Sequence, residues 1–216
     1  MKYQRAVDRL SLIEPYIKGK NVLDIGCVDA RPGSIRKYDT TGLHKFVKSH
    51  AETLLGVDIE AEGVKEMQGK GYNVVCANAE NMRLNQTFDC IVAGEIIEHV
   101  NNAGLFLTAM SEHLSDDGVL VITTPNATCI SNFFRVLKRN TVKVHPDHTC
   151  WYDPITITQL IHRFPLRVEK IIFTNKEKWY RKRYFYKVFR YQIPKLITWL
   201  RPYFSGTIVV IVKKAV

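Results

Sequence analysis

Long hydrophobic runs are absent from the chain, and this excludes two classes of protein. Among the 216 residues, no apolar run approaches the ~18–20 residues that are needed to cross a bilayer. The N-terminal Met1–Arg5 leads into charged sequence rather than into the apolar core of a signal peptide. We therefore expect a cytoplasmic protein.

The sequence also lacks paired cysteine motifs. Its 5 cysteines are odd in number, and none forms a C-x-x-C pair. Cys27, Cys76 and Cys90 fall in or beside apolar runs that are typical of strands. We interpret them as small buried hydrophobic residues in a reducing compartment, rather than as a disulfide framework or a zinc site.

Acidic residues are scarce in the last two-fifths of the chain. Residues 131–216 hold 18 Lys and Arg against 4 Asp and Glu, whereas residues 1–130 hold 13 against 17. The formal net charge of +10 therefore belongs to the C-terminal part, which indicates a segment that meets an anionic partner or surface. With 46% apolar and 24% charged residues, the composition excludes a disordered chain, a collagen and a coiled-coil rod.

Short apolar runs alternate with segments that carry apolar residues at helical spacing. Strands that alternate with helices in this way predict a mostly parallel sheet with helices on both faces. The expected strands span residues 21–26, 54–59, 72–77, 88–93 and 119–123, and the expected helices span residues 3–17, 43–47, 61–70 and 105–114.

Polar side chains stand at the carboxyl ends of these expected strands. In open parallel sheets the ligand binds beyond those ends, so the sequence predicts a site at this edge. The residues concerned are Asp24, Asp58, Asn78, Glu80, Glu95 and Asn126.

Five successive motifs resemble those of class I S-adenosylmethionine (SAM) dependent methyltransferases. Residues 22–27 (VLDIGC) resemble the first motif, with Asp before the first Gly where Rossmann dehydrogenases usually have Gly-x-Gly. Asp58 stands where the family's acid holds both ribose hydroxyls. The remaining motifs are residues 77–80, 88–99 and 118–126. Their Glu-x-x-Glu-His and Thr-Pro-Asn runs are similar to those of glycan- and lipid-tailoring and quinone-biosynthesis O-methyltransferases.

The resemblance covers about residues 15–173 and a last strand at 207–213. It implies the class I methyltransferase fold, an α/β Rossmann-like, seven-stranded, mostly parallel sheet with helices on both faces. We expect residues 1–216 to form a single such domain, with a sixth strand near 168–173 and a basic aromatic insertion at about 174–205. Val28 and Ala30 replace glycines of the family's Gly-x-Gly-x-Gly, which predicts a wider turn.

SAM is the cofactor that the resemblance implies. Gly26 lets the backbone approach the cofactor closely because it has no Cβ, and the Asp58 carboxylate can accept two ribose hydroxyls. Asn78 or a neighbouring backbone N–H would pair with the adenine edge. The expected cofactor-binding residues are Asp24, Gly26, Cys27, Asp58, Ile59, Asn78, Ala79, Glu80, Gly94 and Glu95.

Two clusters of titratable residues are candidates for the catalytic face, namely Glu95-x-x-Glu98-His99 and His145-Pro146-Asp147-His148. We expect His99, His148 and Glu95 to be catalytic, with a histidine as general base, and we expect no metal. If a divalent ion is used, as in similar small-RNA 2′-O-methyltransferases, its ligands would be Glu95, Glu98, His99 and His148. The first three would share one face of a helical turn, on which His148 would converge. The alternative is a local network that ties two loops together.

Residues 176–201 combine 9 Lys and Arg with interleaved aromatic residues. Three interpretations remain open: contact with an anionic membrane, a nucleic-acid surface, and a solvated helical face whose aromatics pack on the sheet. Pro194 and Pro202 argue against one continuous helix. The membrane is favoured over nucleic acid because a lipid-linked acceptor would use both the charge and the aromatics.

The sequence as a whole predicts a SAM-dependent methyltransferase that is cytoplasmic and peripheral to a membrane. We expect O-methylation of a small-molecule, glycan or lipid-linked acceptor. The alternatives are a metal-assisted RNA 2′-O-methyltransferase and a SAM-fold binding module that has lost catalysis.

Overall fold

A computed structural model describes residues 3–5, 8–28, 42–174 and 196–215. Most of the basic aromatic segment, residues 175–195, and the loop at residues 29–41 lie outside this described part. The helices are α1 (Arg9–Ile17), α2 (Leu43–Lys48), α3 (Ala61–Gly69), α4 (Ala103–His113), α5 (Ile130–Arg139) and α6 (Pro154–Ile161), with a 3-10 turn at Pro202–Phe204.

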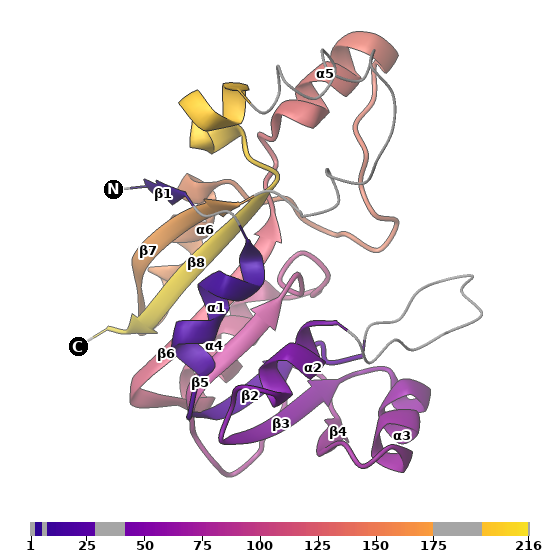
Figure 1. The fold of residues 1–216 in the computed structure, drawn as a ribbon, viewed down its shortest axis with the longest axis vertical. Coiled ribbons are helices and arrows are strands. Elements are labelled where there is room, and N and C mark those ends of the chain that lie inside the picture. Colours follow the sequence, from indigo (N-terminus) through magenta and orange to yellow (C-terminus); the bar gives the residue numbers. More distant parts are fainter. Residues whose placement is uncertain (1–2, 6–7, 29–41, 175–195, 216) are drawn as a thin grey trace.

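One sheet crosses the described part of the chain, and its strands run in the order β1-β7-β8-β6-β5-β2-β3-β4 (Figure 1). All neighbours pair in parallel except β8, which is antiparallel to both β6 and β7. The strands are β1 (Tyr3–Arg5), β2 (Asn21–Ile25), β3 (Thr53–Asp58), β4 (Val74–Cys76), β5 (Phe88–Gly94), β6 (Leu114–Pro125), β7 (Leu166–Thr174) and β8 (Thr207–Lys214).

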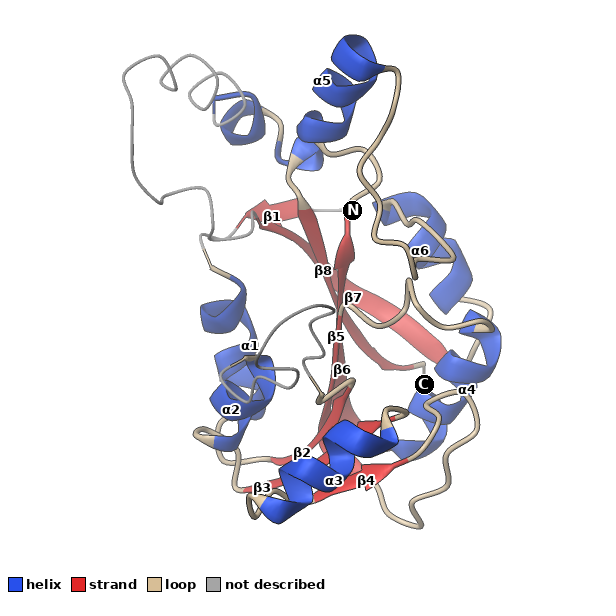
Figure 2. Cartoon of the chain, turned by 90° about the vertical axis from the view of Figure 1, so that its right-hand side faces the viewer, coloured by secondary structure: helices blue, strands red, loops and turns tan. Residues whose placement is uncertain are grey.

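The helices cover both faces of the sheet, as the alternation of strands and helices predicted. Viewed along the sheet, α1 and α2 lie on one side and α4 and α6 on the other (Figure 2). Strands β5 and β8 contribute buried apolar residues to the cores on both faces, which is why their sequences are nearly continuous apolar runs. The seven expected strands are all present.

The N-terminal segment differs from the helix that was expected over residues 3–17. Tyr3–Arg5 adds an eighth strand, β1, parallel to residues 171–173 of β7. The helix begins only at Arg9, because the Asp8 carboxylate accepts hydrogen bonds from the backbone N–H groups of Leu10 and Ser11 and so caps it. Pro15 lies inside this helix without ending it.

Two helices on the C-terminal side of β6 were not expected. Helix α6 begins at Asp153, whose side chain and that of Thr156 form a reciprocal capping box. Helix α5 projects beyond the carboxyl end of β6 (Figure 2). In the described part of the chain, no helix combines the length and the apolar character of a membrane span.

Asn126 follows β6 and fixes the geometry of the strand end. It is 1% exposed, and its side-chain amide donates hydrogen bonds to the carbonyls of Tyr203 and Ser205. Its side-chain oxygen accepts hydrogen bonds from the backbone N–H and the hydroxyl of Thr128. These hydrogen bonds hold the junction between β6 and β8, so Asn126 has a structural role at this strand end.

The Asn126 junction generates a stability prediction. Asn126→Ala would remove the donor to the buried Ser205 carbonyl and one of two donors to the Tyr203 carbonyl, so we expect the free energy of unfolding to fall by about 2–3 kcal/mol. Urea unfolding followed by circular dichroism measures this change, with the exposed Asn101→Ala as the matched control. An Asn126→Ala protein as stable as the control would contradict the structural role.

Candidate functional site

The turn after β2 brings its backbone against the ends of β3 and β5. Gly26 adopts φ 77°, a conformation that residues with a Cβ rarely take, and an added Cβ would collide with the Ile96 side chain. The backbone N–H groups of Gly26 and Cys27 both donate to the carbonyl of Val57. Burial raises the pKa of the Cys27 thiol, as do the nearby Asp24 and Asp58 carboxylates, so this thiol stays protonated.

Asp58 closes β3 and holds the turn that follows β2. One carboxylate oxygen accepts the backbone N–H of Val28 at 2.9 Å, and the other accepts that of Glu60 at 3.0 Å. Burial raises its pKa, and the backbone hydrogen bonds oppose that rise. A carboxylate offers about four acceptor sites, so acceptor capacity remains for further hydroxyl groups. The next residue, Ile59, exposes 69% of its surface and offers an apolar face beside this carboxylate.

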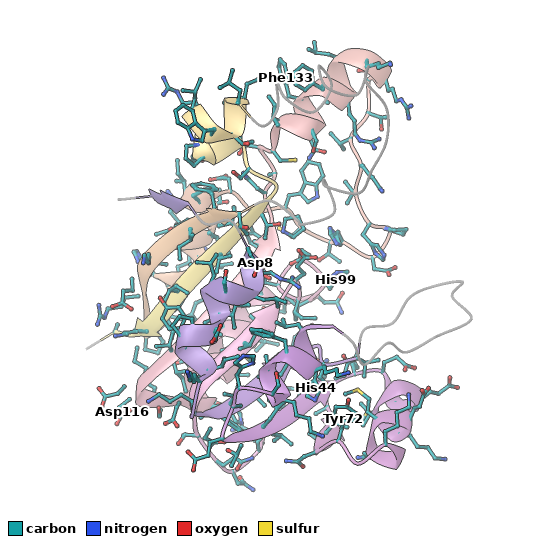
Figure 3. All side chains as sticks on the ribbon, viewed as in Figure 1. Asp8, His44, Tyr72, His99, Asp116 and Phe133 are labelled. Carbon is teal, nitrogen blue, oxygen red and sulfur yellow. The ribbon has the colours of Figure 1, made fainter. Side chains whose placement is uncertain are left out.

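Asp24 lies beneath the turn rather than at its surface. It is 1% exposed, and one of its carboxylate oxygens lies 2.7 Å from Nδ1 of His44, which is itself 4% exposed. Burial raises the pKa of Asp24, and the hydrogen bond from His44 opposes that rise. The pair joins β2 to α2, and His44 lies beside the Tyr72 ring at 5.5 Å between centroids (Figure 3).

The segment after β4 connects two loops of the same edge. The side-chain oxygen of Asn78 accepts the backbone N–H of Glu80. The Glu80 carboxylate accepts the backbone N–H groups of Asn101 and Asn102, just before α4. Ala79 packs against the core between them. These bonds hold the loops in place, and the expected contact of Asn78 with a ligand remains a prediction.

Residues 95–99 form a turn and not the helical turn that was expected. Glu95, after Gly94 at the end of β5, has φ 58°, and its carboxylate lies 3.8 Å from the Arg9 guanidinium. Glu98 is 1% exposed and accepts a hydrogen bond from the Thr124 hydroxyl of β6. The two carboxylates therefore have separate partners, in α1 and in β6.

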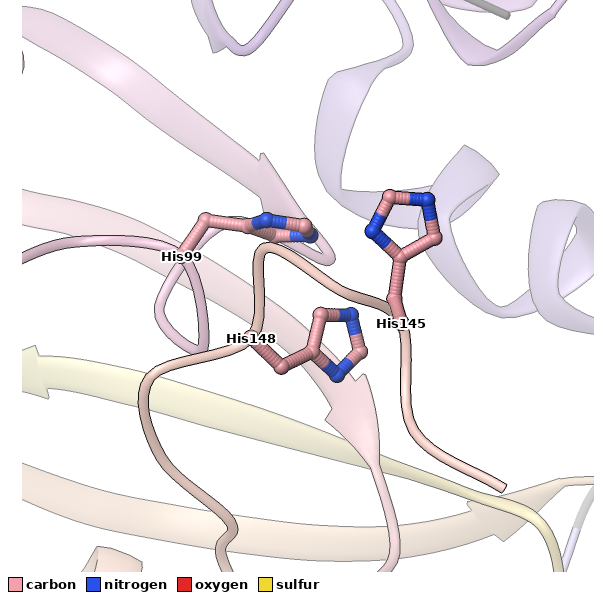
Figure 4. Close-up of side chains that lie close together, drawn as sticks. All are labelled: His99, His145 and His148. Atoms are coloured by element: carbon pink, nitrogen blue, oxygen red, sulfur yellow. The ribbon is translucent and has the colours of Figure 1, made fainter. Parts of the chain in front are cut away.

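His99 at the end of this turn meets two histidines from residues 145–148 (Figure 4). The ring centroid of His99 lies 4.5 Å from that of His148 and 5.7 Å from that of His145, and the latter two are 5.5 Å apart. Burial lowers the pKa of His99, and the neighbouring His145 lowers it further. The structure thus brings the two expected catalytic histidines, His99 and His148, close together.

Three residues at this edge were not among the expected site residues. His145 stood in one of the two candidate clusters but was not among the expected catalytic residues, although its spacing to His148 was a usable signal. His44 and Arg9 carried no signal, because their partners Asp24 and Glu95 lie 20 and 86 positions away and only the fold brings them close.

Comparisons with known proteins agree on one family. The family model of the methyltransferase domain matches residues 1–171. A ubiquinone biosynthesis O-methyltransferase of Rickettsia prowazekii is 26% identical over 119 residues, which are 54% of this chain and 44% of the relative. The mitochondrial ubiquinone biosynthesis O-methyltransferase of Rattus norvegicus is 30% identical over 126 residues, 53% of this chain and 33% of the relative. The chain thus matches less than half the length of these relatives.

A solved structure shares the fold over almost the whole chain. The SAM dependent methyltransferase from Archaeoglobus fulgidus superposes with a TM-score of 0.64 at 22% sequence identity. The match covers 95% of this chain and 91% of that protein.

The buried Asp24–His44 pair generates a pH-dependent prediction. In His44→Ala the Asp24 carboxyl stays buried without its ring partner, and we expect the free energy of unfolding at neutral pH to fall by about 3 kcal/mol. Because loss of the ring raises the pKa of Asp24 further, the folded variant binds a proton that the unfolded chain does not. Its deficit must therefore shrink as the pH falls.

Urea unfolding at neutral and at mildly acidic pH measures both effects. The exposed His162→Ala serves as the control for removal of a histidine ring, and its deficit should be small. A His44→Ala deficit that stays constant or grows on acidification would show that Asp24 does not depend on this ring.

Proposed function

The chain belongs to the methyltransferase domain family, and on this premise we propose that it is an O-methyltransferase that acts on a hydroxyl acceptor. Its fold is the Rossmann-like class I methyltransferase fold, and SAM is the methyl donor, as the motifs predicted. The proposal concerns the class of acceptor, the acceptor-side residues and the surface on which the protein works.

The residues of the carboxyl edge fit the chemistry of SAM. The remaining acceptor capacity of Asp58 suits two ribose hydroxyls, and the exposed Ile59 offers an apolar face that an adenine ring would cover. Gly26 has a left-handed backbone conformation and no side chain, so no Cβ would stand between the backbone of this turn and a bound cofactor. Carboxylates are concentrated here, at Asp24, Asp58, Glu80 and Glu95, and a cationic sulfonium favours such surroundings.

The histidine cluster beyond β5 is the observation that supports a hydroxyl acceptor. SAM supplies an electrophilic methyl group, and a weakly acidic hydroxyl must lose its proton as the new O–C bond forms. His99 is the proposed proton acceptor, because burial and His145 lower its pKa and so keep the ring neutral. The His148 ring lies against the His99 ring, and the Glu95 carboxylate lies 3.8 Å from the Arg9 guanidinium.

The curated relatives support oxygen as the methylated atom, since both are named as O-methyltransferases. We propose a small-molecule, glycan or lipid-linked acceptor, handled by residues 1–216 acting as one domain. The basic C-terminal part favours an acceptor that is anionic or lies on an anionic surface.

We propose that the protein acts at a membrane surface. Helix α5 exposes Phe133 and Leu137, 4 positions apart on one helical face, and carries Lys138 and Arg139 in its last turn. The segment of residues 196–200 lies at the same end of the molecule as α5 (Figure 1). Its Trp199 side chain is exposed. Apolar side chains beside basic ones suit an interface with anionic lipid. Of the expected membrane segment 176–201, the structure describes only residues 196–201.

Transfer of a labelled methyl group tests the proposed reaction. The protein is incubated with trideuteromethyl SAM and an extract of cells, and the products are identified by mass spectrometry. We expect a labelled methyl ether, and we expect His99→Gln to lower its rate of formation at least about 100-fold, with His162→Gln unchanged. Label found on nitrogen, on carbon or on a carboxylate, or full activity of His99→Gln, would contradict the proposal.

Co-sedimentation with vesicles tests the membrane surface. We expect binding to vesicles that contain phosphatidylglycerol, none to pure phosphatidylcholine, and at least tenfold weaker binding of the double variant Phe133→Ser, Leu137→Ser. Leu105→Ser in α4 is the control, because it also removes an exposed apolar side chain. Salt-dependent binding of RNA with no binding to either vesicle would favour the nucleic-acid alternative.

A further inference from the structure

Three histidine side chains converge from two segments that are far apart in the sequence. His99 lies in the turn after β5, whereas His145 and His148 lie in the segment that leads to α6 (Figure 4). Each ring offers one nitrogen, and these three nitrogens lie within 4.8 Å of one another. Within the described residues, this is the one group of histidine, cysteine or carboxylate ligands with that property.

We propose that His99, His145 and His148 bind one divalent ion of the zinc class. An imidazole nitrogen binds zinc at about 2.0–2.1 Å, so three rings in tetrahedral positions have centroids about 5 Å apart. The observed separations of 4.5, 5.5 and 5.7 Å lie around that value. The rings are also tilted against one another, between 33° and 85°, and none of the three pairs is stacked face to face.

The donor atoms select the class of metal. Three neutral imidazoles suit Zn²⁺, Co²⁺ or Ni²⁺, whereas Mg²⁺ and Ca²⁺ require oxygen ligands. No carboxylate belongs to the group of ligand atoms that lie within 4.8 Å of one another; Glu98 instead accepts a hydrogen bond from Thr124, and Glu95 lies beside Arg9. The donor set therefore differs from the two glutamates and two histidines that the motif resemblance implied.

A carboxylate lies beside the most exposed of the three ligands. Nδ1 of His145 is 3.4 Å from the Asp147 carboxylate and accepts the Asp147 backbone N–H at 3.4 Å, so a hydrogen bond from Nδ1 to the carboxylate would replace that backbone contact when an ion binds. A carboxylate that accepts a hydrogen bond from a ligating imidazole orients its ring and strengthens the ligand. His145 would then bind the ion through its other nitrogen.

Three protein ligands leave at least one coordination position open. The cluster lies beyond β5, on the acceptor side of the Glu95 turn. If the proposed O-methylation holds, the open position would take the acceptor's hydroxyl oxygen and lower its pKa, so that the hydroxyl would lose its proton to solvent. With the ion bound, His99 would be a ligand and not the proton acceptor. Metal binding itself does not depend on that reaction.

Titration with metal alone tests the site. The protein is treated with chelator, dialysed, and titrated with Co²⁺ while the visible absorption of tetrahedral cobalt is recorded, and then with Zn²⁺ in a calorimeter. We expect one ion per chain, displacement of Co²⁺ by Zn²⁺, and no competition from Mg²⁺. His145→Ala is the decisive variant, because the exposed loop tolerates it and the implied four-residue set does not include it. We expect it to weaken Zn²⁺ binding at least about tenfold.

His162→Ala and Glu98→Gln serve as controls and should bind Zn²⁺ as the unaltered chain does. Unchanged Zn²⁺ binding by His145→Ala would overturn the proposal, and so would the absence of any saturable Zn²⁺ binding. Loss of binding in Glu98→Gln with preference for Mg²⁺ would replace it with an oxygen-ligand site. None of these outcomes depends on methyl transfer, so the site and the proposed function can fail separately.

Discussion

The parallel pairing of β2 with β3 and β5 is the constraint on which the site depends. Ile25 lies opposite Val57 on one side and Ala93 on the other, so the three strands end at the same level. That alignment places the Gly26 turn, the Asp58 carboxylate and the Glu95 turn side by side, although they are separated by tens of residues. A slip of one residue in either pairing would move each of these groups to the opposite face of the sheet.

The acidic part of the chain is also the part that forms this edge of the sheet. Residues 1–130 carry the excess of acids, and four of these acids lie at the ends of β2, β3, β4 and β5. Not all of them face a ligand: Asp24 is buried against His44, and Glu80 holds two backbone N–H groups. The acids therefore both build the turns and supply the negative potential that a cationic cofactor requires.

The sequence was most informative where the chain is apolar and periodic. The strands β2, β3, β5 and β6 were predicted because buried strands leave short apolar runs that end at a polar residue. The sequence analysis missed the capping of α1 by Asp8. It also missed the pairing of Tyr3–Arg5 with β7, because that pairing joins residues about 170 positions apart. For the same reason, the sequence did not reveal the Asp24–His44 pair or the contact of His145 with His99. Asn126 was placed correctly at a strand end, but a polar residue there serves a junction as readily as a ligand.

Calorimetric titration with SAM, and with its demethylated product, tests most directly the claim that this edge binds the methyl donor. We predict saturable binding of one molecule per chain, weakened at least tenfold in Asp58→Ala because two charge-assisted hydrogen bonds to the ribose are lost. The exposed Asp117→Ala should bind as the unaltered protein does. Absence of binding by the intact protein, or equal affinity of Asp58→Ala and Asp117→Ala, would contradict it.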